Sequence, residues 1–382
     1  MKMLRLPYEK VQLGGPLPWN VRDSEGRLLL TRGHIVSSEE QLQALLQRGA
    51  FVDIEEIREA AGLSNNPPVS SGRSLNLFGL WENTTHELEL LLRDVPKTHD
   101  FVNRIDQFAK QIFALVDRDP EVGIYRTVRQ DKVQPFHYGY IHSVHTALIC
   151  ILMSRRLGWP ESKGMSLVKA ALTMNLPILE LQGQMAKQEV SLKGVQKAII
   201  RKHPAQAALW LEEAGVTDQD WLTAVSQHHE RADGTGYPTG SSAPSELAVA
   251  LRVADVFMAR ISPRTIRPAL TVQEAARQLF REDKGGPLSM AVIKEFGIYP
   301  PGDFVKLKSG ELAIVVKRSA NAKAPLVAAI TDRSGKPVNT SLRRDTAEPE
   351  FVIIGTVADK TLIGNMPPER LYGYAEVTPH PT

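Results

Sequence analysis

The spacing of apolar residues changes twice along the chain. Residues 1–60 mix short apolar stretches with a Gly-containing turn, which predicts a small α+β module. From about residue 77 to 298, apolar residues recur at spacings of three and four, the period of a helix with one buried face. After Tyr299-Pro300-Pro301-Gly302 the period becomes two, as in strands. The predicted fold is mainly α, with an α+β module before the helices and a short β-rich tail after them.

Breaks in these patterns predict the domain boundaries. The segment 61–76 is polar and rich in Pro, Gly and Ser, so we expect a linker after the N-terminal module, which occupies 1–60. A helical hairpin is expected over 77–135, from the patterns Leu77 to Arg93 and Val95 to Val116. A helical domain over 136–298 and the β-rich tail over 299–382 complete the chain.

Composition indicates an ordinary globular protein. Of the 382 residues, 42% are hydrophobic and 23% are charged, close to the average for soluble domains. The longest apolar run, Thr146 to Met153, is far shorter than the roughly 20 residues that span a bilayer, so we expect no membrane span and a cytoplasmic location. Cys150, the only cysteine, lies in that run, which excludes an intramolecular disulfide and predicts a buried thiol.

The net charge of +3 is small, but Lys and Arg exceed Asp and Glu between Arg260 and Arg344. Such a surplus suits a phosphate-bearing ligand, and it fits a solvated surface equally well. The sequence has no helix-turn-helix, zinc-finger or aromatic-plus-basic strand signature, so no nucleic-acid partner is predicted.

The chemistry-bearing residues concentrate between 227 and 238. His228 and His229 are followed by Glu230 and Arg231, and then by the loop Asp233-Gly234-Thr235-Gly236-Tyr237-Pro238. Two consecutive histidines at a helix end can direct both imidazoles at one cluster. Glycines in the loop let the backbone approach a ligand closely. We therefore expect a ligand or metal site here.

This string resembles the signature of the HD-GYP domain of bacterial cyclic di-GMP phosphodiesterases, and the resemblance covers 136–298. It implies the helical bundle of the HD superfamily. The opening segment from Leu13 to Trp19 looks like the small module that often precedes this domain. The resemblance implies five metal ligands, which are His142, His203, His228, His229 and Asp255.

The residue types agree with this assignment, although each also has a plainer interpretation. Asp255 falls on an apolar stripe of a predicted helix, where a carboxylate must be paired or bound to a metal. A buried Asp255 paired with a following arginine is the alternative. His145, one turn after His142, either assists as a neighbouring ligand or simply packs. His203 taken alone would more often be a surface histidine.

The resemblance also implies ligand and partner contacts. Arg264 and Arg267 match positions that face the nucleotide, and a guanidinium fork suits phosphate oxygens. Glu230 and Arg231 complete the expected cyclic di-GMP contacts. A partner, such as a diguanylate cyclase with a GGDEF domain, is expected at the loop residues Asp233, Gly234, Gly236, Tyr237 and Pro238.

The sequence departs from the family pattern between residues 170 and 178. Met174, Asn175 and Ile178 stand where the family has the histidine and aspartate of its name and a lysine. A bridging carboxylate is what allows two cations to lie close together, and a thioether is a poor ligand for manganese, iron(II) or zinc. We therefore expect one transition metal, iron, manganese or zinc, and no bridged two- or three-metal site.

Three hypotheses about function follow. In the first, the protein binds cyclic di-GMP or a partner, and hydrolysis is impaired or absent. In the second, it is an active metal-dependent phosphodiesterase that yields pGpG or GMP, and His145 or Glu180 completes its site. In the third, it is a structural adaptor that binds no nucleotide. The retained arginines and the His-His-Glu-Arg string speak against the third, and the substitutions at 174, 175 and 178 favour the first over the second.

Overall fold

The structure is a computed structural model, and it describes residues 3–6, 17, 19–36, 38, 41–43, 50–53, 56, 76–93, 95, 99–130, 135–357 and 367–373. The chain forms two compact units, Met1–Thr84 with Gly364–Thr382, and Thr85–Ile363. The five-part division expected from the sequence stays a prediction. Its linker, 61–76, lies outside the described residues except for Asn76.

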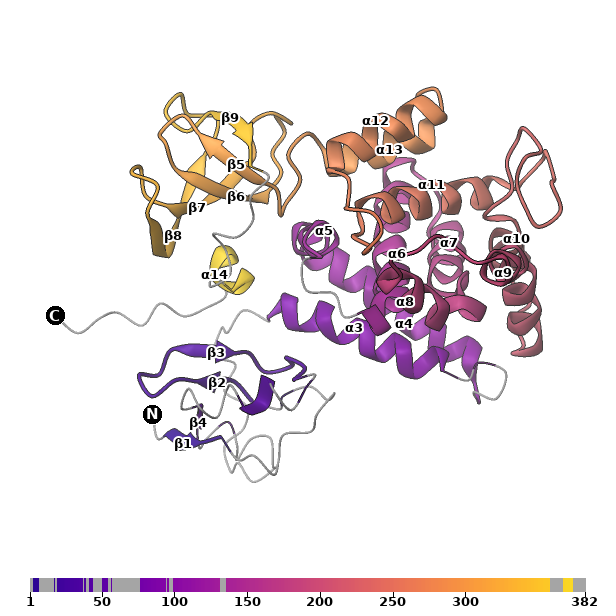
Figure 1. Ribbon diagram of the computed structural model, residues 1–382, viewed down its shortest axis with the longest axis horizontal. Helices are drawn as coiled ribbons and strands as arrows, with labels where there is room; N and C mark the ends of the chain where they lie inside the picture. Colours follow the sequence, from indigo (N-terminus) through magenta and orange to yellow (C-terminus); the bar gives the residue numbers. More distant parts are fainter. Residues whose placement is uncertain are drawn as a thin grey trace. The chain divides into compact units, whose positions relative to one another are not determined.

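The predicted mainly helical class, with a small β-containing module before the helices and strands after them, is confirmed (Figure 1). The described helices between 77 and 296 are α3 (Leu77–Leu92), α4 (Phe101–Arg118), α5 (Pro120–Val128), α6 (Tyr138–Arg156), α7 (Glu161–Thr173), α8 (Leu179–Lys187), α9 (Gly194–Glu213), α10 (Gln219–Gln227), α11 (Glu246–Ile261), α12 (Val272–Glu282) and α13 (Pro287–Phe296). Two 3-10 turns, η3 (Pro135–His137) and η4 (Leu176–Ile178), precede α6 and α8.

Helix α6 is the core of the helical domain. It packs against α7, α8, α11 and α13, and nearly all of its residues from Tyr138 to Ser154 are buried. A helix that is apolar on every side belongs in the interior. Helix α6 therefore places His142 and Cys150 inside the bundle, and the predicted buried, unpaired thiol of Cys150 is confirmed.

Helix α4 begins later than the expected Val95. Asp100, directly before it, has a φ of 59°, a left-handed value that an α-helix does not include. The chain then breaks at Asp119, whose side chain accepts a hydrogen bond from the Glu121 amide at 2.9 Å. With Pro120 at the first helical position, Asp119 starts a new helix, α5. The segment expected to form a two-helix hairpin thus contains a third helix, and the hairpin itself stays a prediction.

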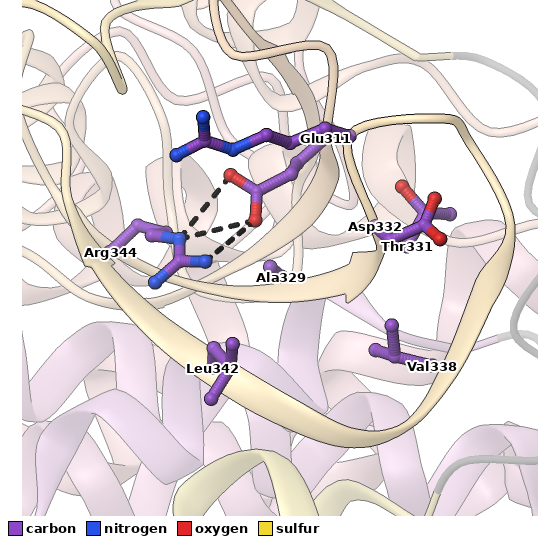
Figure 2. A pocket seen from close by; sticks show the side chains of 8 residues that line it. Glu311, Ala329, Thr331, Asp332, Val338, Leu342 and Arg344 are labelled. Atoms are coloured by element: carbon purple, nitrogen blue, oxygen red, sulfur yellow. Dashed lines mark hydrogen bonds and ion pairs between the residues drawn. The ribbon is translucent and has the colours of Figure 1, made fainter.

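The predicted β-rich tail is an antiparallel sheet of five strands in the order β8-β7-β6-β5-β9. The strands are β5 (Phe304–Leu307), β6 (Leu312–Lys317), β7 (Leu326–Thr331), β8 (Pro337–Asp345) and β9 (Ile353–Thr356). Val305, Leu307, Val315 and Val327 form much of its apolar core. Figure 2 shows a pocket of about 240 Å³ on this sheet, in which Arg344 is hydrogen-bonded to the buried carboxylate of Glu311 at 2.8 Å.

Arg318 forms ion pairs between this sheet and two of the helices. Arg318, directly after β6, makes a two-pronged ion pair with Glu121 of α5 at 2.8 and 3.0 Å. Its other guanidinium nitrogen reaches Glu295 of α13 at 2.9 Å. Arg129 lies over the Phe304 ring, 4.5 Å from the ring centre. The sheet and the helices therefore belong to one compact unit.

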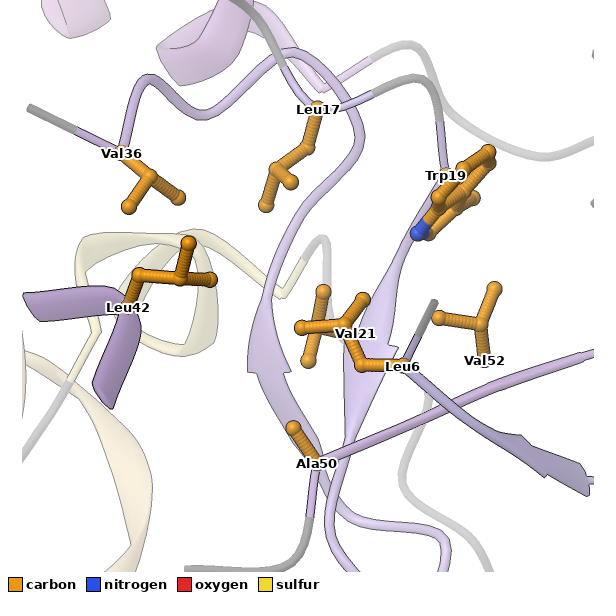
Figure 3. Close-up of a cluster of buried hydrophobic side chains, with 8 residues drawn as sticks. All are labelled: Leu6, Leu17, Trp19, Val21, Val36, Leu42, Ala50 and Val52. Atoms are coloured by element: carbon orange, nitrogen blue, oxygen red, sulfur yellow. The ribbon is translucent and has the colours of Figure 1, made fainter. Parts of the chain in front are cut away.

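The other unit contains a four-stranded sheet in the order β1-β4-β2-β3. Its strands are β1 (Met3–Arg5), β2 (Val21–Arg22), β3 (Leu28–Leu30) and β4 (Phe51–Asp53). A cluster of buried side chains forms its core (Figure 3), namely Leu6, Leu17, Trp19, Val21, Val36, Leu42, Ala50 and Val52. Helix α14 (Pro368–Tyr372) belongs to this unit, and its Tyr372 ring contacts Phe78 of α3.

Candidate functional site

His228 is positioned by the end of α10. Asp218 caps the start of that helix by accepting a hydrogen bond from the Trp221 amide at 3.1 Å. At the other end, His228 follows Gln227 directly, and its Nδ1 lies 2.6 Å from the carbonyl oxygen of Val225. A carbonyl can only accept, so Nδ1 donates, and Nε2 of the neutral ring is left with a free lone pair.

His203 on α9 is held in the same way. Its Nδ1 donates to the carbonyl oxygen of Ile200 at 2.6 Å, so its Nε2 also carries a free lone pair. The Nε2 atoms of His203 and His228 lie 3.1 Å apart. Two acceptors this close repel each other unless a cation lies between them. In metal sites, the ring nitrogen that does not bind the metal usually donates to a carbonyl, as it does in both rings here.

A proton is a poor candidate for that cation. Burial, together with the neighbouring His228, lowers the pKa of His203 to about 3. Burial also lowers the pKa of His228, although the Asp255 carboxylate opposes this. His229, beside them, has its pKa lowered well below the usual value, again mainly by burial. Neutral imidazoles are the form that binds a metal.

Among the described residues, His203, His228 and His229 form the one group whose ligand atoms all lie within 4.8 Å of one another. The residues present therefore fit a metal ion. Imidazole nitrogen suits zinc and iron better than calcium or magnesium.

Asp255 completes a second pair beside this cluster. Its Oδ1 lies 2.7 Å from Nε2 of His142. Burial opposes ionisation of Asp255, but the hydrogen bond and charge of His142 hold its pKa below the usual value. The alternative partner expected from the sequence, a following arginine, does not hydrogen-bond to Asp255 in the part of the chain that the structure describes.

Tyr138 links this pair to Arg264, a role that no sequence pattern indicated. The Tyr138 ring stacks on His142 with ring centres 6.1 Å apart and planes at 16°. Its hydroxyl accepts a hydrogen bond from Nε of Arg264 at 3.0 Å. Arg267 pairs with Arg264 through two backbone hydrogen bonds of 3.0 Å, and its guanidinium donates to the carbonyl of Ala259. Arg264 is partly buried, whereas Arg267 is exposed.

The loop after His229 folds back onto that histidine. The Tyr237 amide donates to the His229 carbonyl at 3.2 Å, and the two rings lie 4.6 Å apart. Gly236 is required there, since an added Cβ would lie 2.5 Å from the Glu230 Cα and from the Arg231 amide nitrogen. Asp233 accepts from the Thr235 amide and hydroxyl, which closes the turn.

Glu230 has a structural task in this loop. It is 2% exposed, and its Oε1 accepts from the amide and the hydroxyl of Thr239 at 2.7 and 2.8 Å. Its Oε2 is buried without a partner among the described residues. Arg231 is exposed and pairs with Asp233 at 3.2 Å. The expected nucleotide contacts of Glu230 and Arg231 stay predictions, as does the partner role of the loop through Pro238.

The segment that contains Met174, Asn175 and Ile178 contacts both α9 and α10, the helices associated with His203 and His228. Thr173, at the end of α7, accepts a hydrogen bond from the Trp221 indole of α10 at 2.8 Å, and η4 packs against α9. Met174 is fully buried, and Asn175 and Ile178 are 3% and 4% exposed. The Nδ2 of Asn175 has no partner among the described residues. No residue of this set offers a carboxylate.

The two residues considered as replacements are His145 and Glu180. His145 is buried on α6, and burial, with Arg126 and His142 nearby, lowers its pKa to about 3. Its Nδ1 has no partner in the described part of the chain. Glu180 is exposed on the first turn of α8. Neither belongs to the close group of three histidines.

Comparison with known proteins was made at three levels. Residues 123–285 match the HD domain family. A cyclic di-GMP phosphodiesterase of Pseudomonas aeruginosa is 27% identical over 214 residues, which cover 51% of this chain and 51% of that protein. A cyclic di-GMP phosphodiesterase of Borreliella burgdorferi is 28% identical over 104 residues, 27% of each chain. The matched segments thus span about half, or less, of these relatives.

Among solved structures, the chain is similar to an HDG"Y"P protein from Bdellovibrio bacteriovorus, with 17% identity and a TM-score of 0.49. That match covers 76% of this chain and 97% of the other. In the described residues, none of the helices combines the length and apolar character needed to cross a membrane.

Proposed function

Because residues 123–285 form an HD domain related to the HD-GYP cyclic di-GMP phosphodiesterases, we propose that this protein binds cyclic di-GMP beside one bound transition metal. We further propose that it hydrolyses the nucleotide slowly or not at all. It would then act in signalling by association, either with the nucleotide alone or together with a partner that contacts the 233–238 loop.

The facing Nε2 atoms of His203 and His228 are the observation that carries the proposal. Two neutral imidazoles with lone pairs 3.1 Å apart form a cation site rather than a packing arrangement. His229 would be the third ligand, and the His142–Asp255 pair would supply a further imidazole and a carboxylate. When bound, a metal ion would neutralise phosphate charge and polarise a phosphate oxygen.

The positively charged side of the site would hold the other phosphate oxygens. Arg264 is connected through the Tyr138 hydroxyl and ring to His142, so only one side chain separates its guanidinium from a proposed ligand. Planar guanidinium groups bind phosphate through two parallel hydrogen bonds. Arg267, held beside Arg264 by the backbone, would extend this contact.

Impaired hydrolysis rests on Met174 and Asn175. Two metals close together need a bridging carboxylate, and an amide at 175 carries no negative charge. A buried thioether at 174 does not replace an imidazole as ligand for a hard or borderline cation. Each missing catalytic element costs a few kcal/mol of the barrier, so turnover should fall by several orders of magnitude.

Calorimetric titration with cyclic di-GMP, paired with chromatography of the reaction products, tests both parts. We expect binding by the wild-type protein, weaker binding by His228→Ala, and no pGpG or GMP after long incubation. His86→Ala is the matched control, because His86 lies on α3 outside the cluster. Rapid product formation would instead support an active phosphodiesterase. Absence of binding with an intact fold would leave the adaptor hypothesis.

A further inference from the structure

The start of α9 and the loop before it form a strongly exposed segment, which we call the α9 tip and define as residues 187–202. Apart from Gln188, Gln196 and Ile200, which are partly buried, every residue of the tip is exposed. Apolar residues are among them, with exposed fractions of 61% for Val190, 37% for Leu192, 73% for Val195 and 42% for Ile199. Four aliphatic side chains so close in sequence are more than the scattered apolar residues of an ordinary surface.

These aliphatic side chains are held in a fixed arrangement. Val195 and Ile199 are four residues apart, so they share one face of the helix. Gln188 donates to the carbonyls of Val190 and Ser191 at 2.7 and 3.0 Å. Its own oxygen accepts from Gln196 on the first turn at 2.8 Å. The loop is thus tied to the helix start, and we call the four exposed apolar side chains of the tip the patch.

Basic residues predominate in the tip. The tip contains Lys187, Lys193, Lys197, Arg201 and Lys202 against one acid, Glu189. In the part of the chain that the structure describes, none of the five basic groups forms an ion pair. Arg201 lies over the Tyr237 ring, 5.6 Å from its centre. The tip therefore combines exposed aliphatic side chains with uncompensated positive charge, which fits an anionic surface.

We infer that the α9 tip binds the surface of an anionic lipid bilayer. Aliphatic side chains beside lysines match the composition of interfacial membrane-binding segments. A protein partner fits less well. The residues that dominate protein interfaces are often Trp and Tyr, which the tip lacks, and Val and Leu are under-represented among such residues. The inference is independent of the metal and nucleotide site. It would place His203, the next residue after the tip, beside the bilayer.

Co-sedimentation with vesicles of equal parts phosphatidylglycerol and phosphatidylcholine, or of phosphatidylcholine alone, tests this. The full chain should sediment with the anionic vesicles only. Each lysine near such a surface contributes about a five-fold change in partitioning. The double variant Lys193→Gln, Lys197→Gln should therefore partition about 25-fold more weakly. Val195→Ser with Ile199→Ser should weaken partitioning by about ten-fold or more.

The C-terminal sheet offers matched controls. Lys306→Gln with Lys308→Gln removes two exposed lysines, and Ile354→Ser removes a side chain that is 60% exposed. These variants should sediment like the wild-type protein. If they lose partitioning as strongly as the tip variants, binding reflects net charge and the α9 tip is not the site. If the wild-type protein stays in solution with every vesicle, the inference is wrong and the patch fits a protein partner instead.

Discussion

The Nε2 atoms of His203 and His228 face each other at 3.1 Å, and each ring donates its other nitrogen to the carbonyl three residues before it. The backbone carbonyls of α9 and of the end of α10 thus fix both the tautomer and the direction of each ring. The pKa of His203 is lowered to about 3, mainly by burial, so both rings are neutral lone-pair donors at neutral pH. The backbone thus sets the ring orientations and the tautomers that a bound cation would need.

Metal content is the first prediction. The purified protein should carry about one transition metal per chain, because the histidines can fill one coordination sphere and no bridging carboxylate is present at 175. His203→Ala should lower the metal content several-fold, whereas His86→Ala should not. Elemental analysis after growth with iron, manganese or zinc measures this. Two tightly bound metals per chain would contradict the single-metal site.

The second prediction restores the missing ligands. Met174→His together with Asn175→Asp should raise the metal content toward two per chain, since an imidazole and a carboxylate replace groups that bind metal poorly. Ile178→Lys, added to the pair, should increase any hydrolysis. Both sites are buried, so circular dichroism must first show an intact fold. A folded triple variant with no additional metal would mean that the pocket is not built for a second ion.

Arg264 and Arg267 are the subject of the third prediction. Each charge-assisted contact with phosphate contributes about 1.5 to 3 kcal/mol, so Arg264→Ala or Arg267→Ala should weaken cyclic di-GMP binding by about 10- to 150-fold. Arg277→Ala, an exposed arginine on α12, is the control and should bind normally. Equal affinities for all three variants would show that the phosphate contacts lie elsewhere.

The fourth prediction uses Tyr138→Phe to distinguish the contact of Tyr138 with Arg264 from its contact with His142. The change removes the hydroxyl that accepts from Arg264 but keeps the ring on His142. One lost hydrogen bond of about 1 kcal/mol should weaken nucleotide binding by about five-fold, without changing the metal content. Titration calorimetry and elemental analysis on the same preparation measure both. A loss of metal would mean that the hydroxyl supports the ligands rather than the arginine.

The last prediction concerns the C-terminal sheet and pH. Burial opposes ionisation of Glu311, but hydrogen bonds from Arg344 and Ser309 lower its pKa below the usual 4.5. A lowered folded-state pKa stabilises the fold above the unfolded value, and this contribution is lost as the pH falls through the folded value. Arg344→Gln should therefore reduce the free energy of unfolding by about 1 to 3 kcal/mol at pH 7, and by less as the pH approaches 3.

Urea unfolding of the wild-type protein and the variant across this pH range measures the difference. The control is Lys110→Gln, which breaks a pair with Asp106 on α4 at 2.7 Å, with side chains 57% and 30% exposed. An exposed pair contributes below about 1 kcal/mol. A constant deficit of Arg344→Gln at all pH values would mean that Arg344 acts through packing.

Local patterns predicted the elements well. Apolar residues at spacings of three and four gave helix α3 to within one residue, and alternation gave strands β5 to β7. The adjacent residues His228 and His229 indicated a ligand cluster from the sequence, because both directly follow the end of one helix. His203 joined them only through resemblance to a family, since it lies 25 residues earlier and nothing in its local sequence distinguishes it from a surface histidine.

Contacts between distant segments could not be predicted. The nucleotide contact of Glu230 stays a prediction, and no pattern in the sequence indicated that its Oε1 accepts a hydrogen bond from Thr239, nine residues on. The Tyr138–Arg264 hydrogen bond joins residues 126 apart. Such pairs depend on how helices pack, and neither residue carries a periodic or compositional sign of its partner. Sequence thus located the candidate ligands more readily than the residues that orient them.

The ion pairs of Arg318 with Glu121 and Glu295 bear on the choice of bounds for a truncated fragment of this protein. The segment that matches the HD domain family, 123–285, begins after Glu121 and ends before Glu295 and Arg318. A fragment with these bounds lacks Glu121, Glu295 and Arg318. A longer fragment that includes Glu121 but stops at residue 299 keeps the two carboxylates and lacks Arg318, the guanidinium that both contact. A piece that retains these ion pairs must extend from α5 into the C-terminal sheet, so it is longer than the segment that matches the HD domain family.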